Sequence, residues 1–143
     1  MGIEQTAAAV RDVMSPDALR VHASDTIGRA RDLSARAGAH ALPVEENGRI
    51  VGILTTTDLV DNWRDDRRVD TVMTRHPHRV KGDVPVADAA RLMLERRVHH
   101  LVVDEPDGDV GILSSFDLLE VIASRPDDGT SLDRPGREPT SKP

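Results

Sequence analysis

Hydrophobic positions in this chain follow two patterns, one typical of helices and one typical of short strands. Residues 86–96 carry apolar side chains at helical spacing, and residues 26–37 have the Ala-, Arg- and Leu-rich composition of a helix. Ser24 or Asp25 is expected to cap this earlier helix, and Gly38 to follow its last turn. Short apolar runs predict buried strands at 41–44, 50–54, 101–103 and 110–113.

Turn signals and flanking segments complete the order of elements. Asn47-Gly48 predicts a hairpin, and a Pro-Asp-Gly turn at 106–108 separates the later pair of strands. Residues 19–21 and 78–80 are expected to be extended. A short helix is expected to run to about Trp63, and a final helix over 116–123. Each half of the chain is therefore predicted to have the order β-α-β-β-α.

The two halves repeat one another at an offset of 59 residues. Val13-Met14 recurs as Val72-Met73 (13 to 72), and Gly52-Ile53-Leu54 recurs as Gly111-Ile112-Leu113 (52 to 111). A unit of about 50 residues buries little surface, so the two copies are expected to share one core. The predicted fold class is α/β (α+β). Its predicted parts are an N-terminal helix (1–11), copy one (12–61), a charged solvated linker (62–70), copy two (71–122) and a disordered tail (123–143).

Composition narrows the function classes. The chain has no Cys or Tyr, and Trp63 and Phe116 are its only aromatic residues. Thiol chemistry is therefore excluded, and nucleic-acid binding by base stacking is disfavoured, as is phosphate-backbone binding at a net charge of −6. No apolar run reaches the roughly 18–20 residues of a membrane span, and the first residues do not resemble a signal peptide. We expect a cytoplasmic protein without membrane or nucleic-acid partners.

One motif follows the hairpin of each copy and carries the candidate chemistry. Gly-hydrophobic-hydrophobic-[Thr/Ser]-x-x-Asp occurs at 52–58 and again at 111–117. The hydroxyl and the Asp three residues later fit an N-terminal capping box. They also fit a nucleotide site, because a carboxylate can accept from a ribose diol. Recurrence in both copies favours a shared ligand role, and the two roles are compatible.

Together these segments resemble a tandem pair of CBS domains (the cystathionine-β-synthase motif), a stand-alone Bateman module. The resemblance rests on Asp12-Val-Met-Ser-Pro, on residues 42–59 and on residues 99–119, and covers about 10–122. It implies a non-catalytic regulatory module whose repeats pack about a pseudo-two-fold axis and bind an adenosine nucleotide (AMP, ADP, ATP or S-adenosylmethionine) in the clefts between them. It also implies a homodimer that acts on a regulated protein partner.

The resemblance also assigns site residues. Asp58 and Asp117 would hold ribose hydroxyls, and Thr55 and Ser114 would lie at the phosphate or ribose. The remaining assigned residues would enclose the base or meet phosphate: Leu42, Pro43, Val80, Lys81, His99, His100 and Leu101, with His40, Thr57 and Phe116 as further candidates. Copy two departs from the pattern with Val102 where copy one has Pro43. Because Arg96, Arg97, His99 and His100 belong to copy two, we expect the site built from copy-two residues to bind phosphate better.

Alternative functions remain open at this point. Six histidines suggest a metal site, but their spacing fits no compact zinc motif. A Ser-His-Asp triad is disfavoured because no Gly-x-Ser-x-Gly elbow is present. DNA binding lacks a helix-turn-helix segment outside the repeats. The strongest alternative is a structural or dimerisation module with empty clefts that acts through a protein partner.

Overall fold

The computed structural model describes residues 8–124, and its first half contains one complete repeat. A 3-10 helix η1 (Val10–Asp12) precedes it. The repeat then runs through β1 (Val21–His22), α2 (Ile27–Ala37), β2 (Ala41–Glu46), β3 (Arg49–Thr55) and α3 (Thr56–Leu59). Asn47 and Gly48 both have positive φ, at 54° and 77°, as the predicted hairpin turn requires.

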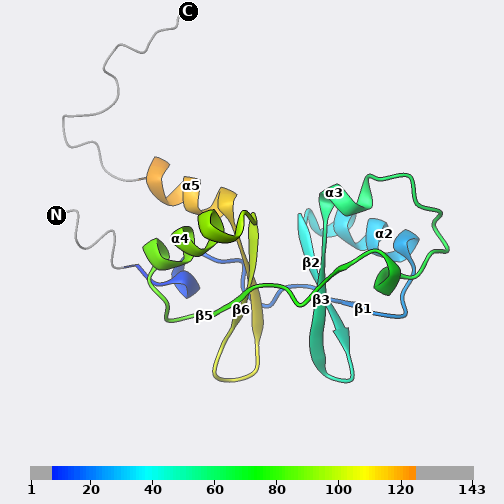
Figure 1. Cartoon of the computed structure of the whole chain (residues 1–143), viewed down its shortest axis with the longest axis horizontal. Coiled ribbons are helices and arrows are strands. Elements are labelled where there is room, and N and C mark those ends of the chain that lie inside the picture. The colour runs from blue at the N-terminus through cyan, green and yellow to red at the C-terminus, as the bar shows by residue number, and fades with distance from the viewer. Residues whose placement is uncertain (1–7, 125–143) are drawn as a thin grey trace, which may run out of the picture.

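The second half has the same order of elements (Figure 1). After η2 (Val69–Thr71) and β4 (Thr74–Arg75), the second repeat comprises β5 (Arg79–Lys81), α4 (Val86–Arg96), β6 (His100–Asp104), β7 (Val110–Ser114) and α5 (Ser115–Ala123). Within each repeat the first strand pairs in parallel with the second, which pairs antiparallel with the third. The predicted β-α-β-β-α order and mixed class are confirmed.

The segment that leads into each repeat crosses to the sheet of the other repeat. β4, which precedes the second repeat, pairs antiparallel with β3 of the first. Reciprocally, the Ser15 N–H donates to the Ile112 carbonyl at 2.9 Å, and the Ile112 N–H donates back at 3.0 Å. The motif glycines make this approach possible. A Cβ on Gly52 would lie 2.9 Å from the Thr74 carbonyl oxygen, and one on Gly111 would lie 2.9 Å from that of Ser15.

Successive side chains of each strand point to opposite faces of the sheet, and the buried ones form three hydrophobic clusters. Leu42 and Val44 point toward α2 in the first repeat, and Leu101 and Val103 point toward α4 in the second. The intervening side chains face the other repeat. Ala41, Ile53, Val102, Val110 and Ile112 form an apolar seam between the two sheets. The repeats therefore share a core, with helices on the outer side of each sheet (Figure 1).

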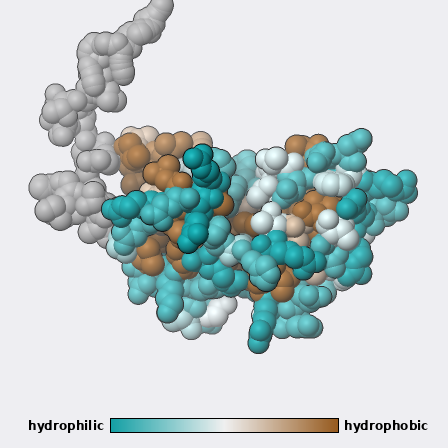
Figure 2. Space-filling model, viewed as in Figure 1, coloured by the Kyte–Doolittle hydropathy of each residue, from teal (hydrophilic) through white to brown (hydrophobic). Residues whose placement is uncertain are grey.

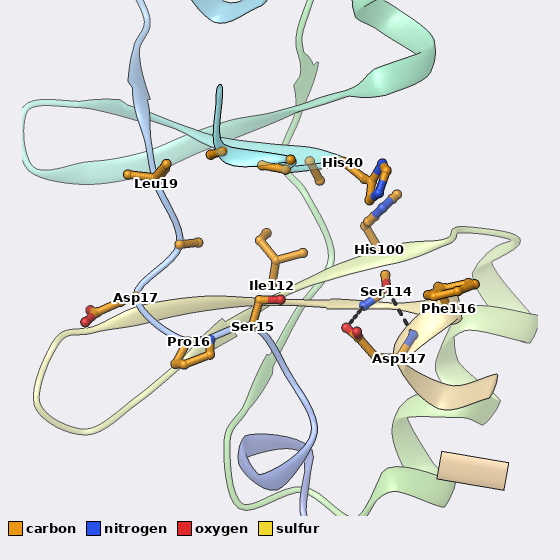
Figure 3. A pocket seen from close by; sticks show the side chains of 15 residues that line it. Ser15, Pro16, Asp17, Leu19, His40, His100, Ile112, Ser114, Phe116 and Asp117 are labelled. Carbon is orange, nitrogen blue, oxygen red and sulfur yellow. Dashed lines mark hydrogen bonds between the residues drawn. The ribbon is translucent and has the colours of Figure 1, made fainter. Parts of the chain in front are cut away.

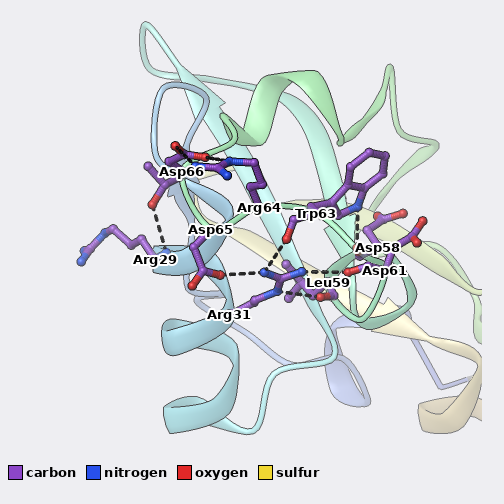
Figure 4. Close-up of polar contacts among 10 residues, drawn as sticks. Arg29, Arg31, Asp58, Leu59, Asp61, Trp63, Arg64, Asp65 and Asp66 are labelled. Carbon is purple, nitrogen blue, oxygen red and sulfur yellow. Dashed lines mark hydrogen bonds and ion pairs between the residues drawn. The ribbon is translucent and has the colours of Figure 1, made fainter.

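Most residues of the connector between the repeats are exposed, and polar contacts also hold it against the first repeat (Figure 4). α3 ends after four residues rather than near Trp63, because Asp61 turns back to accept from the Asn62 N–H at 2.7 Å. Arg31 on α2 then donates to the Leu59, Asp61 and Trp63 carbonyls and to the Asp65 carboxylate. Residues 60–68, here called the strap, are thereby fastened across α2.

The cap of α2 also differs from the expected one. Thr26, not Ser24 or Asp25, caps α2 by accepting from the Arg29 N–H at 3.1 Å, while Asp25 accepts from His22 in the preceding turn. Trp63 packs against the first repeat's own core. Its ring lies 4.3 Å from the Arg67 guanidinium, and its N–H donates to the Asp58 carbonyl.

Parts of the predicted ends lie outside the described residues. Most of the predicted N-terminal helix (1–11) and nearly all of the predicted disordered tail (123–143) fall there. Where 1–11 is described, it contains a bridge at Ala9 and the single 3-10 turn of η1. Over residues 8–124, no helix combines the length and apolar character that crossing a membrane requires.

Candidate functional site

Two clefts lie where the repeats meet, and their walls correspond at the 59-residue offset. One, the Ser114 cleft, has a volume of about 320 Å³, and the other, the Thr55 cleft, about 330 Å³. Both volumes fall in the range of about 300–1,000 Å³ typical of small-molecule sites. Each of the eleven residues that line the Thr55 cleft has its counterpart among the residues that line the Ser114 cleft; for example, Thr74, Ile53, Thr55 and Thr57 match Ser15, Ile112, Ser114 and Phe116.

The Ser114 cleft is centred on the junction of β7 and α5 (Figure 3). Ser114 accepts from the Asp117 N–H at 3.1 Å, and Asp117 Oδ2 accepts from the Ser114 N–H at 2.8 Å. This reciprocal capping box fixes both side chains against the cleft. Within the described residues, the other carboxylate oxygen of Asp117 has no hydrogen-bond partner. The cap thus leaves an acceptor available for a ligand hydroxyl.

The Thr55 cleft has the same junction in the first repeat, but with one difference. Asp58 Oδ2 accepts from the Thr55 N–H at 2.8 Å and from its hydroxyl at 3.1 Å. Thr55 and Thr57 line the cleft, whereas Asp58 does not. Asp58 is therefore hydrogen-bonded to a residue that lines its cleft, Thr55, whereas Asp117 lines its cleft directly.

Histidines stand at the turns that precede β2 and β6. His40 and His100 line the Ser114 cleft with their rings close together, and His99 and His100 line the Thr55 cleft (Figure 3). Burial lowers the pKa of His100, the neighbouring His99 and His40 lower it further, and Asp117 opposes the shift. Within residues 8–124 no three His, Asp or Glu side chains are grouped as a metal ion would need.

Besides Asp58, five of the residues assigned by resemblance do not line either cleft. Leu42, Pro43 and Leu101 are almost wholly buried, in strands whose side chains fill the cores and the seam. Val80 packs on the second core, and Lys81 lies in a separate depression beside Arg11 and Glu105. Only the strand ends at His40-Ala41 and His100 reach the clefts, because the middles of these strands are covered on both faces.

Sequence reasoning missed the segments that complete each cleft. Residues 15–19 line the Ser114 cleft, and residues 74–78 line the Thr55 cleft. A sequence signal for these segments was present, because Val13-Met14 directly precedes the first segment and Val72-Met73 directly precedes the second. What the repeat could not reveal is that each segment crosses to the opposite sheet.

This crossing also changes the expected phosphate site. The prediction placed His99 and His100 with copy two's own Ser114 and Asp117. In the structure His99 lines the Thr55 cleft, whose Thr55 belongs to copy one, and His100 lines both clefts. Each cleft takes its hydroxyl junction from one repeat and its histidine turn from the other. Arg96 and Arg97 line neither.

Comparisons with known proteins agree with this architecture. A family model described as CBS domain matches residues 10–65 and 69–124. The inosine-5′-monophosphate dehydrogenase of Methanocaldococcus jannaschii is 32% identical over 111 residues, which cover 76% of this chain but 22% of the enzyme. The chain spans between 15% and 42% of the length of curated relatives that it matches.

Solved structures reproduce the whole described arrangement. An uncharacterized conserved protein from Pyrococcus horikoshii matches with a TM-score of 0.74 at 26% identity, covering 85% of this chain and 97% of that chain. CBSX2 in complex with AMP matches with a TM-score of 0.67 at 27% identity, covering 80% and 96% of the two chains. CBSX2 is a CBS-pair protein from Arabidopsis thaliana.

Proposed function

Because the chain belongs to the CBS-domain family, we propose that it is a non-catalytic regulatory module that binds an adenine nucleoside or nucleotide between its repeats. The observation that carries this proposal is the pair of matched clefts. Each has a capped hydroxyl at a strand-helix junction from one repeat and a histidine turn from the other. The likeness to a CBS pair solved with AMP supports the choice of ligand class.

The Ser114 cleft explains how such a ligand would be held. The outward oxygen of Asp117 can accept hydrogen bonds from a ribose diol, and Ser114 holds that carboxylate in place. Ile112 and Leu19 supply aliphatic surface, which suits a base in a protein with almost no aromatic residues. Binding here touches both repeats, so a ligand that prefers one arrangement of the repeats would stabilise that arrangement.

Calorimetric titration and thermal unfolding with adenosine and AMP test the proposal. A ligand that binds only the folded chain raises its stability by RT ln(1 + [L]/Kd). We expect saturable stabilisation, and the response to adenosine should weaken at least tenfold in Asp117→Asn. Asp32→Asn, the same change at an exposed carboxylate on α2 outside both clefts, is the matched control and should behave as wild type. If neither ligand stabilises the chain at millimolar concentration, the proposal is wrong.

A second candidate function, self-association, is favoured by one surface. Leu94 on α4 and Phe116, Leu119 and Ile122 on α5 are large apolar side chains that are 59–78% exposed. Figure 2 shows brown side chains gathered over α5. The two helices also carry opposite charges that could pair, because Arg96 lies on α4 and Glu120 on α5. A second copy packed with α4 against α5 would bury the apolar face and pair these charges.

Sedimentation across a concentration series tests this association. We expect a dimer that Leu119→Asp and Ile122→Asp convert to a monomer with an unchanged circular dichroism spectrum. Val60→Asp is the matched control, because Val60 is an even more exposed apolar residue at the position that corresponds to Leu119. A wild-type chain that is monomeric at all concentrations, or a Val60 variant that dissociates equally, would contradict this assignment.

A further inference from the structure

The two clefts have the same backbone frame but differ at most corresponding positions, and three of the differences that change side-chain polarity lie on the crossing segments. Pro16, Asp17 and Leu19 on one crossing segment correspond to Arg75, His76 and His78 on the other (16 to 75, 17 to 76, 19 to 78). Asp17 and His76 share a left-handed backbone, with φ of 49° and 53°. Their side chains therefore leave the two chains in the same direction and contribute to the same part of each wall.

These replacements make the Thr55 cleft cationic. Arg75 carries a permanent charge, and its guanidinium also donates to the Asp70 carbonyl at 3.2 Å. His76, His78, His99 and His100 add imidazoles that can donate to a phosphate. Among the described residues that line this cleft there is no Asp or Glu. A 5′ phosphate would meet several donors here and no opposing carboxylate.

The Ser114 cleft has the opposite character. Asp17 and Asp117 both line it, and no Lys or Arg is among its described lining residues. Asp17 also lies close enough to Asp109 to raise the pKa of that carboxyl, after the larger influence of Asp107. Where the Thr55 cleft has His78 and Thr57, this cleft has the apolar Leu19 and Phe116, both largely exposed. A 5′ phosphate would be repelled here, and an uncharged 5′ group would find apolar contacts.

We propose that the clefts divide their ligands by charge: the Thr55 cleft takes a 5′-phosphorylated adenine nucleotide, and the Ser114 cleft takes an adenine nucleoside without a phosphate. This assignment rests on the proposed function and adds ligand classes to its two sites. The chain thereby responds to two metabolite classes separately, because the ligands do not compete for one cleft.

Amide chemical-shift mapping with AMP and 5′-methylthioadenosine tests the assignment in the wild-type chain. We expect AMP to shift the amides of Thr57 and His76, and 5′-methylthioadenosine to shift those of Asp17 and Ser114. AMP binding should weaken as salt rises, whereas binding of the uncharged nucleoside should not. If both ligands shift both sets of amides at equal concentrations, the division by charge is wrong.

A reciprocal charge exchange gives the sharper test. Asp and His both tolerate positive φ better than most residues, so the backbone accepts the exchange. His76→Asp should weaken AMP binding at least tenfold, equivalent to about 1.4 kcal/mol, and leave 5′-methylthioadenosine binding unchanged. Asp17→His should raise the AMP stoichiometry from one to two per chain. Asp88→His, the same charge change on α4 outside both clefts, should leave both titrations unchanged.

The possible outcomes separate the two proposals. If AMP, adenosine and 5′-methylthioadenosine all fail to bind the wild-type chain, the proposed function itself is wrong. If they bind but the two exchange variants behave as wild type, only the division by charge is wrong. Arg75→Gln is a second variant that tests the Thr55 cleft should His76→Asp fail to fold, and it should weaken AMP alone.

Discussion

The two repeats share one frame up to the motif Asp and then differ. After Asp58 the first repeat ends its helix at Leu59, and the strap returns over α2. After Asp117 the second repeat continues as α5 to Ala123 and leaves an apolar face exposed. Trp63, folded onto the first core, corresponds to the exposed Ile122 (63 to 122). The strand-helix junction at the cleft is thus alike in both repeats, although the helix that follows it ends and packs differently.

The difference has a local cause and a tertiary one. Asp61-Asn62 disfavours a helix because the Asp61 side chain bonds the next backbone N–H, whereas the matching stretch of α5 has better helix formers. Arg31 then satisfies the carbonyls released at the end of α3. Its counterpart in the second repeat is Ala90 (31 to 90), which can make no such bonds.

Arg31→Ala should have the largest effect, because it removes the bonds that only the first repeat has. Three backbone carbonyls and a carboxylate lose a charged donor, and we expect a loss of about 3 kcal/mol of stability in urea denaturation. Arg29→Ala is the control on the same helix, since Arg29 is mostly exposed and its ion pair is long, at 3.8 Å. Equal losses from the two variants would mean that the strap is not held by Arg31.

Gly52→Ala and Gly111→Ala test a feature that both repeats share, the close approach of the crossing segment to the motif glycine. An added Cβ would meet the crossing backbone in both, and we expect each to cost about 1–3 kcal/mol. Gly52→Ala should cost more, because the neighbouring Met73 is buried whereas Met14 is only partly buried and can move aside. Thermal unfolding of the two variants ranks them. A greater cost at Gly111 would contradict this reasoning.

Ser114→Ala and Thr55→Val compare the two capping boxes without ligand. Ser114 accepts from its helix at 3.1 Å and Thr55 at 3.4 Å, so the cap of α5 is the tighter one. We expect Ser114→Ala to cost about 1 kcal/mol and Thr55→Val less. Denaturant midpoints check the order, and the prediction is wrong if Thr55→Val proves the more destabilising.

His100→Ala gives copy two the residue that copy one has at this position, Ala41 (41 to 100). Among these variants, we expect it to have the smallest effect on stability. Burial lowers the pKa of His100 in the folded chain, so the unfolded chain takes up the proton first. The wild type should therefore lose stability as pH falls below the ordinary value of 6.5, and the loss levels off below the folded pKa. His100→Ala should flatten this part of the stability–pH curve. An unchanged curve would refute the assignment.

Much of the fold followed from local signals. The bounds of α4 were predicted residue by residue, and Asn47-Gly48 turns as its sequence indicates. The strap was not predicted, because its order depends on Arg31, which lies 28 or more residues away from the groups it binds. For the site, the hydroxyl-Asp motif identified both junctions, but the residues that the resemblance assigned in the middles of the strands do not line the clefts.

The sequence by itself determined the two-fold repetition, the order of elements and the capped junctions, since these rest on contacts within a few residues. Only the tertiary structure decided which residues share a cleft. Segments 15–19 and 74–78 each bond to the sheet of the other repeat, and this pairing brings Asp17 into the same cleft as Asp117 and His76 into the same cleft as Thr55. The charge of each cleft therefore arises from long-range backbone pairing that no local pattern encodes.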